Sequence, residues 1–292
     1  MNKIVVFPNW LYIEPVTFCD KWCLLCYVSP DIKKMYRVLS KSTVLRFVGA
    51  FLKAKKRITV YWCGGGEIFN HPDFPKIINE LNKKYGMRIT HYIQTNASKI
   101  WELSEIKSFK NIRMVVSIDA PKEHHDWNRG FGAYDQAIEF CRLALKWGTP
   151  RIYVRCLITK DNIYKLKQAK KQVYRDIGNG LKIRFYIIKT FSNKDISGLK
   201  VMGPIRDDSK VMNSTQVDLV LEKVYKNEFR EMWPDDPGVE ISLLSDGKVY
   251  NCSEGVIPIG NPSESPDALI KKLRKSPALC KRSCKMFHKC FS

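Results

Sequence analysis

The sequence predicts an α/β fold, a partial (β/α)6 TIM-like barrel followed by a small cysteine-rich domain at the C-terminus. Two observations predict the barrel. Short apolar runs of strand type recur along residues 11–189, and amphipathic segments of helical period separate them. Such an alternation requires parallel strands joined by right-handed crossovers. Six units of this kind form an open, three-quarter barrel rather than a closed eightfold one.

The six strand candidates are rich in β-branched and aromatic residues, as strands generally are. In barrels of this kind the chemistry lies at the carboxyl ends of the strands, so the residue that follows each strand is a site candidate. The candidates are residues 11–16, 58–63, 88–95, 112–118, 152–159 and 183–189.

Apolar residues that repeat at helical spacing mark the helices between these strands. Ser42 or Thr43 is the expected N-cap of the first. Gly86 and Gly148 stand where C-cap glycines are expected for two others. The expected helices cover residues 44–52, 75–85, 134–147, 163–173 and 215–225.

We expect three parts along the chain: a barrel over residues 1–192, a bridging segment over 193–236 and an auxiliary domain over 237–292. The last part opens with a hairpin over residues 241–251, whose Ser-Asp-Gly sequence is typical of a turn. No apolar run approaches the roughly 20 residues that cross a bilayer. The N-terminal segment lacks the features of a signal peptide, which predicts a cytoplasmic protein without membrane contact.

Charge and cysteine content are both unusual. The 292 residues include 50 Lys and Arg against 29 Asp and Glu, a formal net charge of +21, and 10 cysteines. In a reducing compartment, ten cysteines indicate metal binding or thiol chemistry rather than five disulfides. The positive charge indicates an anionic partner, or simply a solvated lysine-rich surface.

Three cysteines lie within eight residues, in a C-x3-C-x2-C spacing over Cys19, Cys23 and Cys26. Three thiolates hold three corners of a metal centre and leave one open. Structural zinc sites need four closed ligands, whereas a tight cysteine loop suits a cubane iron–sulfur cluster. The spacing therefore favours an open [4Fe-4S] cluster, with a zinc knuckle or buried thiols as the alternatives.

This spacing, directly after a first strand, resembles the signature of the radical S-adenosylmethionine (radical SAM) superfamily. The resemblance implies that the open iron binds S-adenosylmethionine (SAM) and that Tyr27, the aromatic residue beside the third cysteine, lies at the cofactor. The family usually has its aromatic residue just before that cysteine, where this chain has Leu25.

Other matches to the family follow later strands. Residues 64–67, Gly-Gly-Gly-Glu, resemble the family motif that binds the methionine amino group; glycines let the backbone approach closely, and a carboxylate pairs with an ammonium. The polar residues after later strands would contact the ribose or the methionine carboxylate of SAM. Alternatively, they would only cap helices, stabilise turns or form structural ion pairs. The expected cofactor-binding residues are Gly65, Gly66, Glu67, Thr95, Asn96, Ser117, Asp119 and Arg155.

Four more cysteines, Cys252, Cys280, Cys284 and Cys290, form a complete coordination set near the C-terminus. They resemble the "twitch" half of the SPASM extension of radical SAM enzymes, which implies one auxiliary [4Fe-4S] cluster. Zinc is the competing occupant.

The three remaining cysteines differ in their expected places. Cys141 lies on the apolar stripe of a helix and is expected in the core. Cys156 is expected to face away from Arg155 on the same strand. Cys63 ends a strand before the glycine run, where it would return a hydrogen atom to a substrate radical or remain a buried structural thiol.

The resemblance implies an enzyme that cleaves SAM reductively to a 5′-deoxyadenosyl radical and abstracts hydrogen from a substrate carbon, in an oxidation, epimerisation or cross-linking reaction. The charge favours an anionic substrate such as a nucleic acid or phosphorylated compound, or an acidic electron donor of flavodoxin or ferredoxin type. A ribosomally made peptide is the alternative substrate, although the early first strand leaves no room for a leader-binding module. The alternative from another functional class is a non-catalytic module that holds an iron–sulfur cluster or zinc and binds nucleic acid.

Overall fold

The computed structural model describes residues 10–26, 28, 30–178, 182–189, 209–212, 214–226, 228–229, 241–251 and 257–275. Predictions for Tyr27, Cys252, Cys280, Cys284 and Cys290 fall outside these residues.

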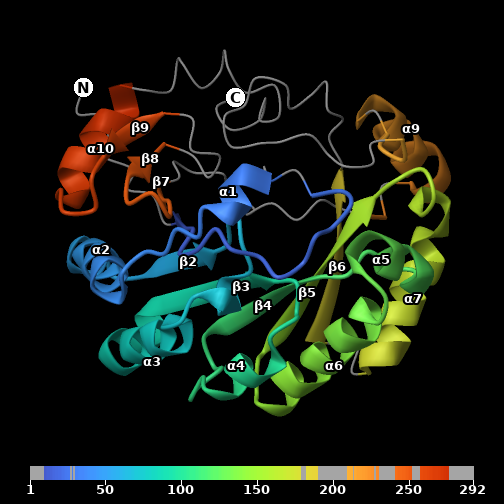
Figure 1. The fold of residues 1–292 in the computed structure, drawn as a ribbon, viewed down its shortest axis with the longest axis horizontal. Helices are drawn as coiled ribbons and strands as arrows, with labels where there is room; N and C mark the ends of the chain where they lie inside the picture. The colour runs from blue at the N-terminus through green and yellow to red at the C-terminus, as the bar shows by residue number, and fades with distance from the viewer. Residues whose placement is uncertain are drawn as a thin grey trace.

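Nine strands of the described chain form one open sheet in the order β6-β5-β4-β3-β2-β1-β7-β8-β9. The first six are parallel and adjacent in sequence order, which confirms the predicted partial barrel (Figure 1). They are β1 (Trp10–Ile13), β2 (Ile58–Trp62), β3 (Ile89–Thr95), β4 (Ile112–Ser117), β5 (Arg151–Ile158) and β6 (Ile183–Lys189).

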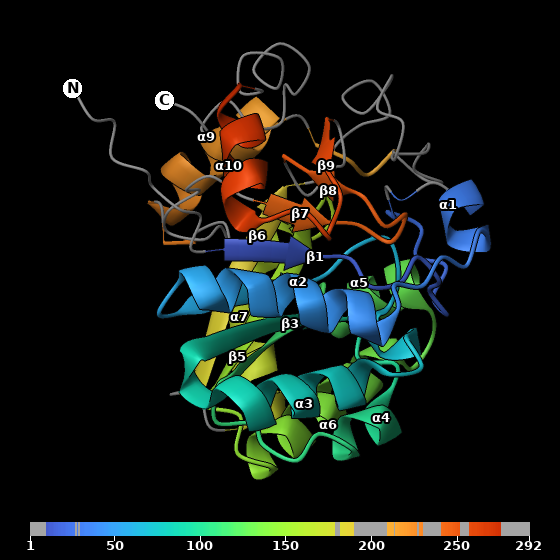
Figure 2. The same ribbon diagram turned by 90° about the vertical axis from the view of Figure 1, so that its left-hand side faces the viewer.

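Helices cover the outer, convex side of this curved sheet (Figure 1). Figure 2 shows that two further helices, α1 and α5, lie at the end of the barrel toward which β1 points. The helices are α1 (Pro30–Lys34), α2 (Lys41–Ala54), α3 (Phe74–Tyr85), α4 (Ile100–Ser104), α5 (Lys122–Arg129), α6 (Ala133–Lys146), α7 (Leu166–Ile177), α9 (Ser214–Tyr225) and α10 (Pro266–Lys275), with 3-10 turns η1 (Ile68–Asn70), η2 (Gly86–Arg88) and η3 (Ile163–Lys165).

Burial alternates along the strands and separates the two faces of the sheet. In β3 and β5 every second residue is buried and the others are half-buried. The buried residues point outward and pack against the helices, because successive side chains of a strand point to opposite faces. Cys156 lies on this buried face and Arg155 on the other, as predicted, and Cys141 is fully buried in α6. The inner face is therefore the accessible side of the barrel.

The predicted helix ends are confirmed at two places and wrong at one. Gly86, with φ of 53°, caps α3, and Gly148, with φ of 94°, follows α6. The N-cap of α2 is Ser40 rather than Ser42 or Thr43, because the Ser40 hydroxyl accepts a hydrogen bond from the backbone N–H of Thr43 at 3.2 Å. The helix therefore begins earlier than its apolar stripe.

The predicted C-terminal hairpin joins the barrel sheet. Its first strand, β7 (Ile241–Leu243), pairs in parallel with β1, and β8 (Val249–Tyr250) returns antiparallel to it. A third strand, β9 (Pro258–Gly260), extends the sheet. The division at residues 192 and 236 stays a prediction. Among the described residues no helix is both long and apolar enough to cross a lipid bilayer.

Candidate functional site

The loop that carries Cys19, Cys23 and Cys26 follows β1 at the carboxyl end of the barrel. All three cysteines are free and half-buried. The loop is fixed to the next crossover, because the backbone N–H of Glu67 donates to the carbonyl of Phe18 at 2.9 Å. The structure thus brings the cysteine loop and the glycine-rich loop together, as a shared cofactor requires.

The glycines of residues 64–66 are needed for this close approach. A Cβ at Gly66 would lie 2.2 Å from the carbonyl oxygen of Phe18, closer than any side chain allows. A Cβ at Gly64, whose φ is 152°, would lie 2.2 Å from Cγ of Glu14. Gly65 has more room, since the nearest atom to its Cβ would be 3.3 Å away.

Glu14, which we did not select from the sequence, connects three elements of the site. Its carboxylate accepts a hydrogen bond from the backbone N–H of Gly65 at 2.7 Å and one from the hydroxyl of Ser245 at 2.5 Å. Burial raises the pKa of this carboxyl above its ordinary value, although these hydrogen bonds oppose the shift. The feature of the sequence that could have identified Glu14 is its position directly after the first strand. Glu14 ties the glycine loop to the turn between β7 and β8.

Glu67 is buried, with 2 % of its surface exposed, and organises the end of β3. Its carboxylate accepts hydrogen bonds from the hydroxyl of Thr95 and from the backbone N–H of Asn96, both at 2.6 Å. Burial raises the pKa of Glu67 to about 7 despite these bonds. Three of the predicted cofactor-binding residues therefore form one contact network.

Asn96 extends that network to the cysteine loop. Its side-chain amide lies 3.6 Å from the sulfur of Cys19. Burial, followed by the negative charge of Glu67, raises the pKa of Cys19 to about 12. Metal binding at this thiol would therefore release a proton, because the thiolate is the ligand form.

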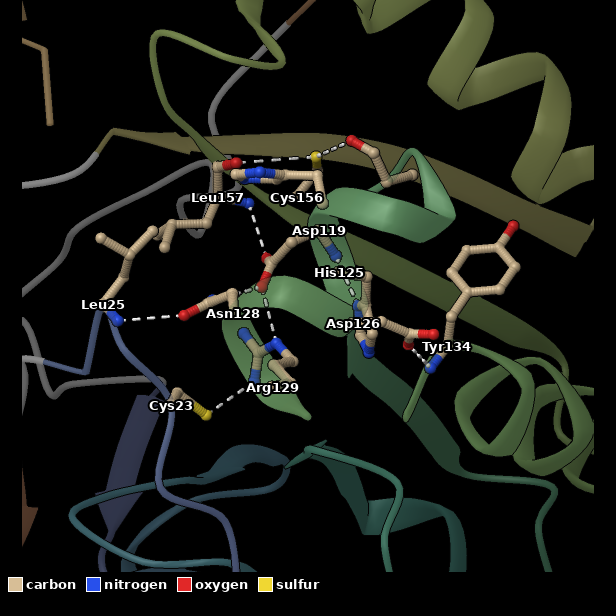
Figure 3. A network of polar contacts seen from close by, with 12 residues as sticks. Cys23, Leu25, Asp119, His125, Asp126, Asn128, Arg129, Tyr134, Cys156 and Leu157 are labelled. Atoms are coloured by element: carbon tan, nitrogen blue, oxygen red, sulfur yellow. Dashed lines mark hydrogen bonds and ion pairs between the residues drawn. The ribbon is translucent and has the colours of Figure 1, made fainter. Parts of the chain in front are cut away.

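Asp119 has no exposed surface and is occupied by contacts within the protein (Figure 3). Its carboxylate pairs with Nε of Arg129 at 2.6 Å and accepts from the amide of Asn128 at 2.8 Å and the backbone N–H of Leu157 at 3.0 Å. Burial alone would raise the pKa of Asp119, but the positive charge of Arg129 holds it well below its usual range. Any contact of Asp119 with SAM remains a prediction; the contacts in the structure are those of a positioning residue.

The end of α5 holds the cysteine loop through Asn128 and Arg129, which we did not single out as functional residues. The backbone N–H groups of Leu24 and Leu25 donate to Asn128, one to its carbonyl and one to its side-chain oxygen, both at 3.0 Å. The guanidinium of Arg129 reaches the sulfur of Cys23 at 3.9 Å, and Figure 3 shows it between Asp119 and Cys23. The sequence gives little indication of these two roles, because Asn128 and Arg129 contact residues that lie more than 100 positions away along the chain.

The inner face of the barrel is lined by tyrosines and arginines. Arg155 bonds to Gln94 and reaches the hydroxyl of Tyr61 at 3.4 Å, so its guanidinium lies across the inner face. Its predicted pairing with the SAM carboxylate stays a prediction. A row of half-buried aromatic residues crosses this face, each ring within 6.1 Å of the next: Tyr12, Tyr61, Tyr92, Tyr153 and Tyr186.

Ser117 and Cys63 lie near the same end of the barrel. Ser117 ends β4, is half-buried and pairs in register with Arg155. Cys63 follows β2 with 7 % of its surface exposed, and its backbone N–H donates to Ile13 at 3.1 Å. Cofactor binding by Ser117 and hydrogen donation by Cys63 both stay predictions, as does the alternative of a buried structural thiol at Cys63.

The donor set is three free thiols in one loop, the ligand type of an iron–sulfur cubane. Within the described ranges, no group of three His, Cys, Asp or Glu side chains is placed as the ligands of one metal ion. Cys23 and Cys19 each have a nitrogen donor near the sulfur, from Arg129 and Asn96, and such donors stabilise cluster sulfurs.

A family model described as the radical SAM superfamily matches residues 13–172, more than half of the chain. The chain belongs to the radical SAM superfamily. Its cofactors are accordingly SAM and a [4Fe-4S] cluster, and the predicted family is confirmed.

Solved structures of this superfamily have the same fold. Native anSMEcpe with bound AdoMet superimposes with a TM-score of 0.64, at 18% identity over 97% of this chain and 88% of that chain. Streptococcus suis SuiB bound to its precursor peptide SuiA gives a TM-score of 0.67, at 17% identity over 93% of this chain and 65% of that one. At these identities the likeness establishes the fold alone.

One curated relative matches part of the chain. An uncharacterized protein of Archaeoglobus fulgidus is 28% identical over 134 residues, which is 44% of this chain and 31% of that protein. The chain therefore spans about a third of the length of this relative.

Proposed function

We propose that this chain cleaves SAM reductively and uses the resulting radical to abstract hydrogen from a carbon atom of its substrate. One observation carries the proposal: the cysteine loop, the glycine loop and the end of β3 are joined through Glu67, which contacts Phe18, Thr95 and Asn96. Among the described residues, the cysteine loop and the glycine loop thus lie at the same end of the barrel as Thr95 and Asn96.

When bound, the cluster and SAM supply a 5′-deoxyadenosyl radical; the protein supplies binding, orientation and exclusion of water. Cys19, Cys23 and Cys26 are the proposed cluster ligands. Gly65, Gly66 and Glu67 are the proposed contacts of the methionine amino group, with Tyr27, Thr95, Asn96, Ser117, Asp119 and Arg155 as the other proposed cofactor residues. Cys63 is the proposed hydrogen donor, if the reaction needs one.

The inner face of the barrel favours a substrate with an anionic group. Arg113, Arg155 and Arg184 occupy its strand positions, and neither Asp nor Glu occupies an inner-face position within β1 to β6. A carboxylate or phosphate is the group that guanidinium and tyrosine hydroxyls bind best. A substrate with such a group, in a reaction of the oxidation, epimerisation or cross-linking kind, is therefore our proposal.

A peptide is the form of substrate that we favour. SuiB is bound to a precursor peptide, and anSMEcpe is described with a bound Cp18Cys peptide. The stacked tyrosines present little ring face to a ligand, because their faces contact one another, whereas single-stranded nucleic acids need free aromatic faces. The auxiliary [4Fe-4S] cluster on Cys252, Cys280, Cys284 and Cys290 remains part of the proposal.

The test is SAM cleavage by anaerobically reconstituted protein. With dithionite and SAM we expect 5′-deoxyadenosine and methionine in equal amounts, and no 5′-deoxyadenosine from a Cys19→Ala, Cys23→Ala, Cys26→Ala triple variant. Absence of 5′-deoxyadenosine from the unmodified protein with a full complement of iron would contradict the proposal. Product analysis of Cys63→Ala tests the hydrogen donor separately, since an unchanged product would remove that role.

A further inference from the structure

A groove opens at the amino end of the barrel, the end from which the arrow of β1 starts in Figure 2, and so lies opposite the cysteine loop. Its volume is about 540 Å³, a size typical of pockets that bind small molecules. One wall is the end of α3 with η2, and the other is the connection from α4 to β4. The proposed function uses no residue of this groove.

Side-chain amides join the two walls of the groove. The amide of Asn82 in α3 donates to the carbonyl of Ser108 at 3.4 Å, and the side-chain oxygen of Asn79 accepts from the backbone N–H of Lys107 at 2.9 Å. Asn111, which is 4 % exposed, donates to the side-chain oxygen of Asn82 at 2.7 Å. These bonds fix the walls to each other, so the groove is formed before any ligand binds.

Three exposed lysines on the lining, Lys83, Lys107 and Lys110, give the groove its charge. Among the residues that the structure describes, none of the three is in an ion pair. The acidic residue on the lining, Glu80, is already paired with Lys41, with 2.6 Å between Oε1 and Nζ. A lysine in the last turn of a helix, such as Lys83, also offsets the helix dipole. Lys107 and Lys110 lie beyond the end of α4, so that role does not account for them.

Positive charge is concentrated at this end of the barrel. The connections that lead from a helix into β2, β3, β4 and β5 contain six basic residues and one acidic residue, whereas those that leave the same strands contain two basic and three acidic residues. The entering connections are residues 55–57, 86–88, 105–111 and 147–150, and the leaving ones are residues 63–67, 96–99, 118–121 and 159–162. An anion in solution is therefore attracted to the end of the barrel that holds the groove.

We propose that this groove binds the phosphate group of a small organic molecule, at a site separate from the one at which SAM is cleaved. The lysine ammonium groups bind phosphate as point charges, and Ser108 adds a hydroxyl donor on the lining. Met87, which is 64 % exposed, supplies an apolar contact for the organic part. The length of β3, about 20 Å at about 3.3 Å per residue, separates the groove from Thr95 at the proposed SAM site.

The lining favours a small molecule over a strand of nucleic acid. Proteins that bind single strands provide aromatic rings on which successive bases stack. Among the described residues that line the groove, none is aromatic. Trp147 at the same end of the barrel is 36 % exposed, but it lies outside the lining and its ring stacks on that of Phe109, with centroids 6.1 Å apart. Charge without a stacking surface suits a phosphate group better than a row of bases.

The test is ligand binding by the reconstituted protein without a reductant, so the result does not depend on SAM cleavage. The probes are GTP and inorganic pyrophosphate, with guanosine as the probe that lacks phosphate, and isothermal titration calorimetry measures each Kd. The variants are Lys107→Glu and Lys110→Glu on the lining. Lys56→Glu is the control, because it repeats the change of charge at an exposed position of the amino end outside the lining.

We expect GTP to bind saturably with a Kd below about 1 mM, and guanosine to bind at least about tenfold more weakly, because it lacks the charged group. Lys107→Glu and Lys110→Glu should each weaken the binding of GTP and of pyrophosphate about tenfold, since a charge that attracts phosphate is replaced by one that repels it. Lys56→Glu should change either Kd by less than about threefold at physiological salt, because screening weakens the effect of a charge that does not contact the ligand.

Three results would overturn the proposal. The first is the absence of saturable binding by both GTP and pyrophosphate. The second is an equal loss of binding in Lys56→Glu and the two groove variants, which would assign the binding to the positive surface in general. The third is a single-stranded oligonucleotide that binds more tightly than GTP and loses affinity in the groove variants, which would make nucleic acid the ligand. All three lysines are exposed, so the variants should fold, and equal melting temperatures verify this.

Discussion

The carboxylate of Asp119 lies 2.6 Å from Nε of Arg129, and the same guanidinium lies 3.9 Å from the sulfur of Cys23. The exposed fraction of the side chain is 0% for Asp119 and 15% for Arg129. The carboxylate of Asp119 holds the Arg129 guanidinium beside Cys23, a proposed cluster ligand, and at the same time neutralises its positive charge. The pair therefore contributes to folding and positions the site.

We predict that Asp119→Asn destabilises the protein by about 3 kcal/mol, because it leaves the buried charge of Arg129 unpaired. For a chain of this size the melting temperature should fall by about 6 °C. Thermal unfolding of the anaerobic protein measures the change.

An exposed ion pair provides the matched control. Arg142 and Glu139 stand 3.8 Å apart with about half of each side chain exposed. Glu139→Gln should change stability by less than about 1 kcal/mol, since exposed pairs contribute little. Equal melting temperatures for Asp119→Asn and Glu139→Gln would contradict the role that we give to the buried pair.

Asn128 is predicted to be needed for a well-formed cysteine loop. Asn128→Ala removes the acceptor of the Leu25 N–H and the donor to Asp119, leaving buried polar groups without partners. We expect reconstituted Asn128→Ala to hold less than half of the iron of the unmodified protein. Iron and acid-labile sulfide per chain measure this directly.

Asn79→Ala is the control for losing a side-chain amide that bridges two other groups. Its side chain also joins two backbone groups, the carbonyl of Glu105 and the N–H of Lys107, but on an exposed surface. Asn79→Ala should keep its full iron content. If both variants lost iron equally, the effect would be one of general stability rather than of the cysteine loop.

Alanine substitutions at Gly66 and Gly65 are predicted to have very different effects on stability and iron content, although the two residues are neighbours. A methyl group at Gly66 meets the backbone of Phe18 at 2.2 Å and must displace the cysteine loop, whereas one at Gly65 meets Glu14 at 3.3 Å and needs only a small shift. Gly66→Ala should cost about 2 kcal/mol or more and lower the iron content. Gly65→Ala should fold and load iron normally. Similar melting temperatures for the two variants would contradict this reading of the loop.

Residues that act near their own strand could be predicted from the sequence. The six parallel strands, the C-cap at Gly86 and the buried side of Cys156 follow from periodicity, which depends on local geometry. The cysteine spacing and the Gly-Gly-Gly-Glu run could be read because each is one short segment.

Residues whose role depends on contacts with distant parts of the chain could not be predicted from the sequence. Nothing local marks Glu14 as the partner of Gly65 and Ser245, since the second contact spans 231 positions. Asn128 and Arg129 acquire their roles only when α5 is folded against the cysteine loop. Asp119 was correctly placed at the end of β4, but its polar partners depend on tertiary packing that the sequence does not display.

The pKa of Glu67 predicts how SAM binding depends on pH. Burial raises this pKa from an ordinary value of 4.5 to about 7, so the protonated form is favoured in the folded protein. Without ligand, its contribution to stability is present at low pH and is lost as the pH rises through about 7. An ammonium group at Glu67 would reverse this preference, because it pairs only with the carboxylate.

SAM should therefore bind more tightly as the pH rises from 6 to 7. About a tenth of the Glu67 carboxyls are ionised at pH 6 and about half at pH 7, so the Kd should fall about fivefold over this interval. Equilibrium dialysis of the reconstituted protein measures the Kd. Glu67→Gln keeps the size of the side chain but cannot ionise, and should bind SAM weakly and equally at both values. A fivefold change that persists in Glu67→Gln would assign the pH dependence to another group and remove Glu67 from the SAM site.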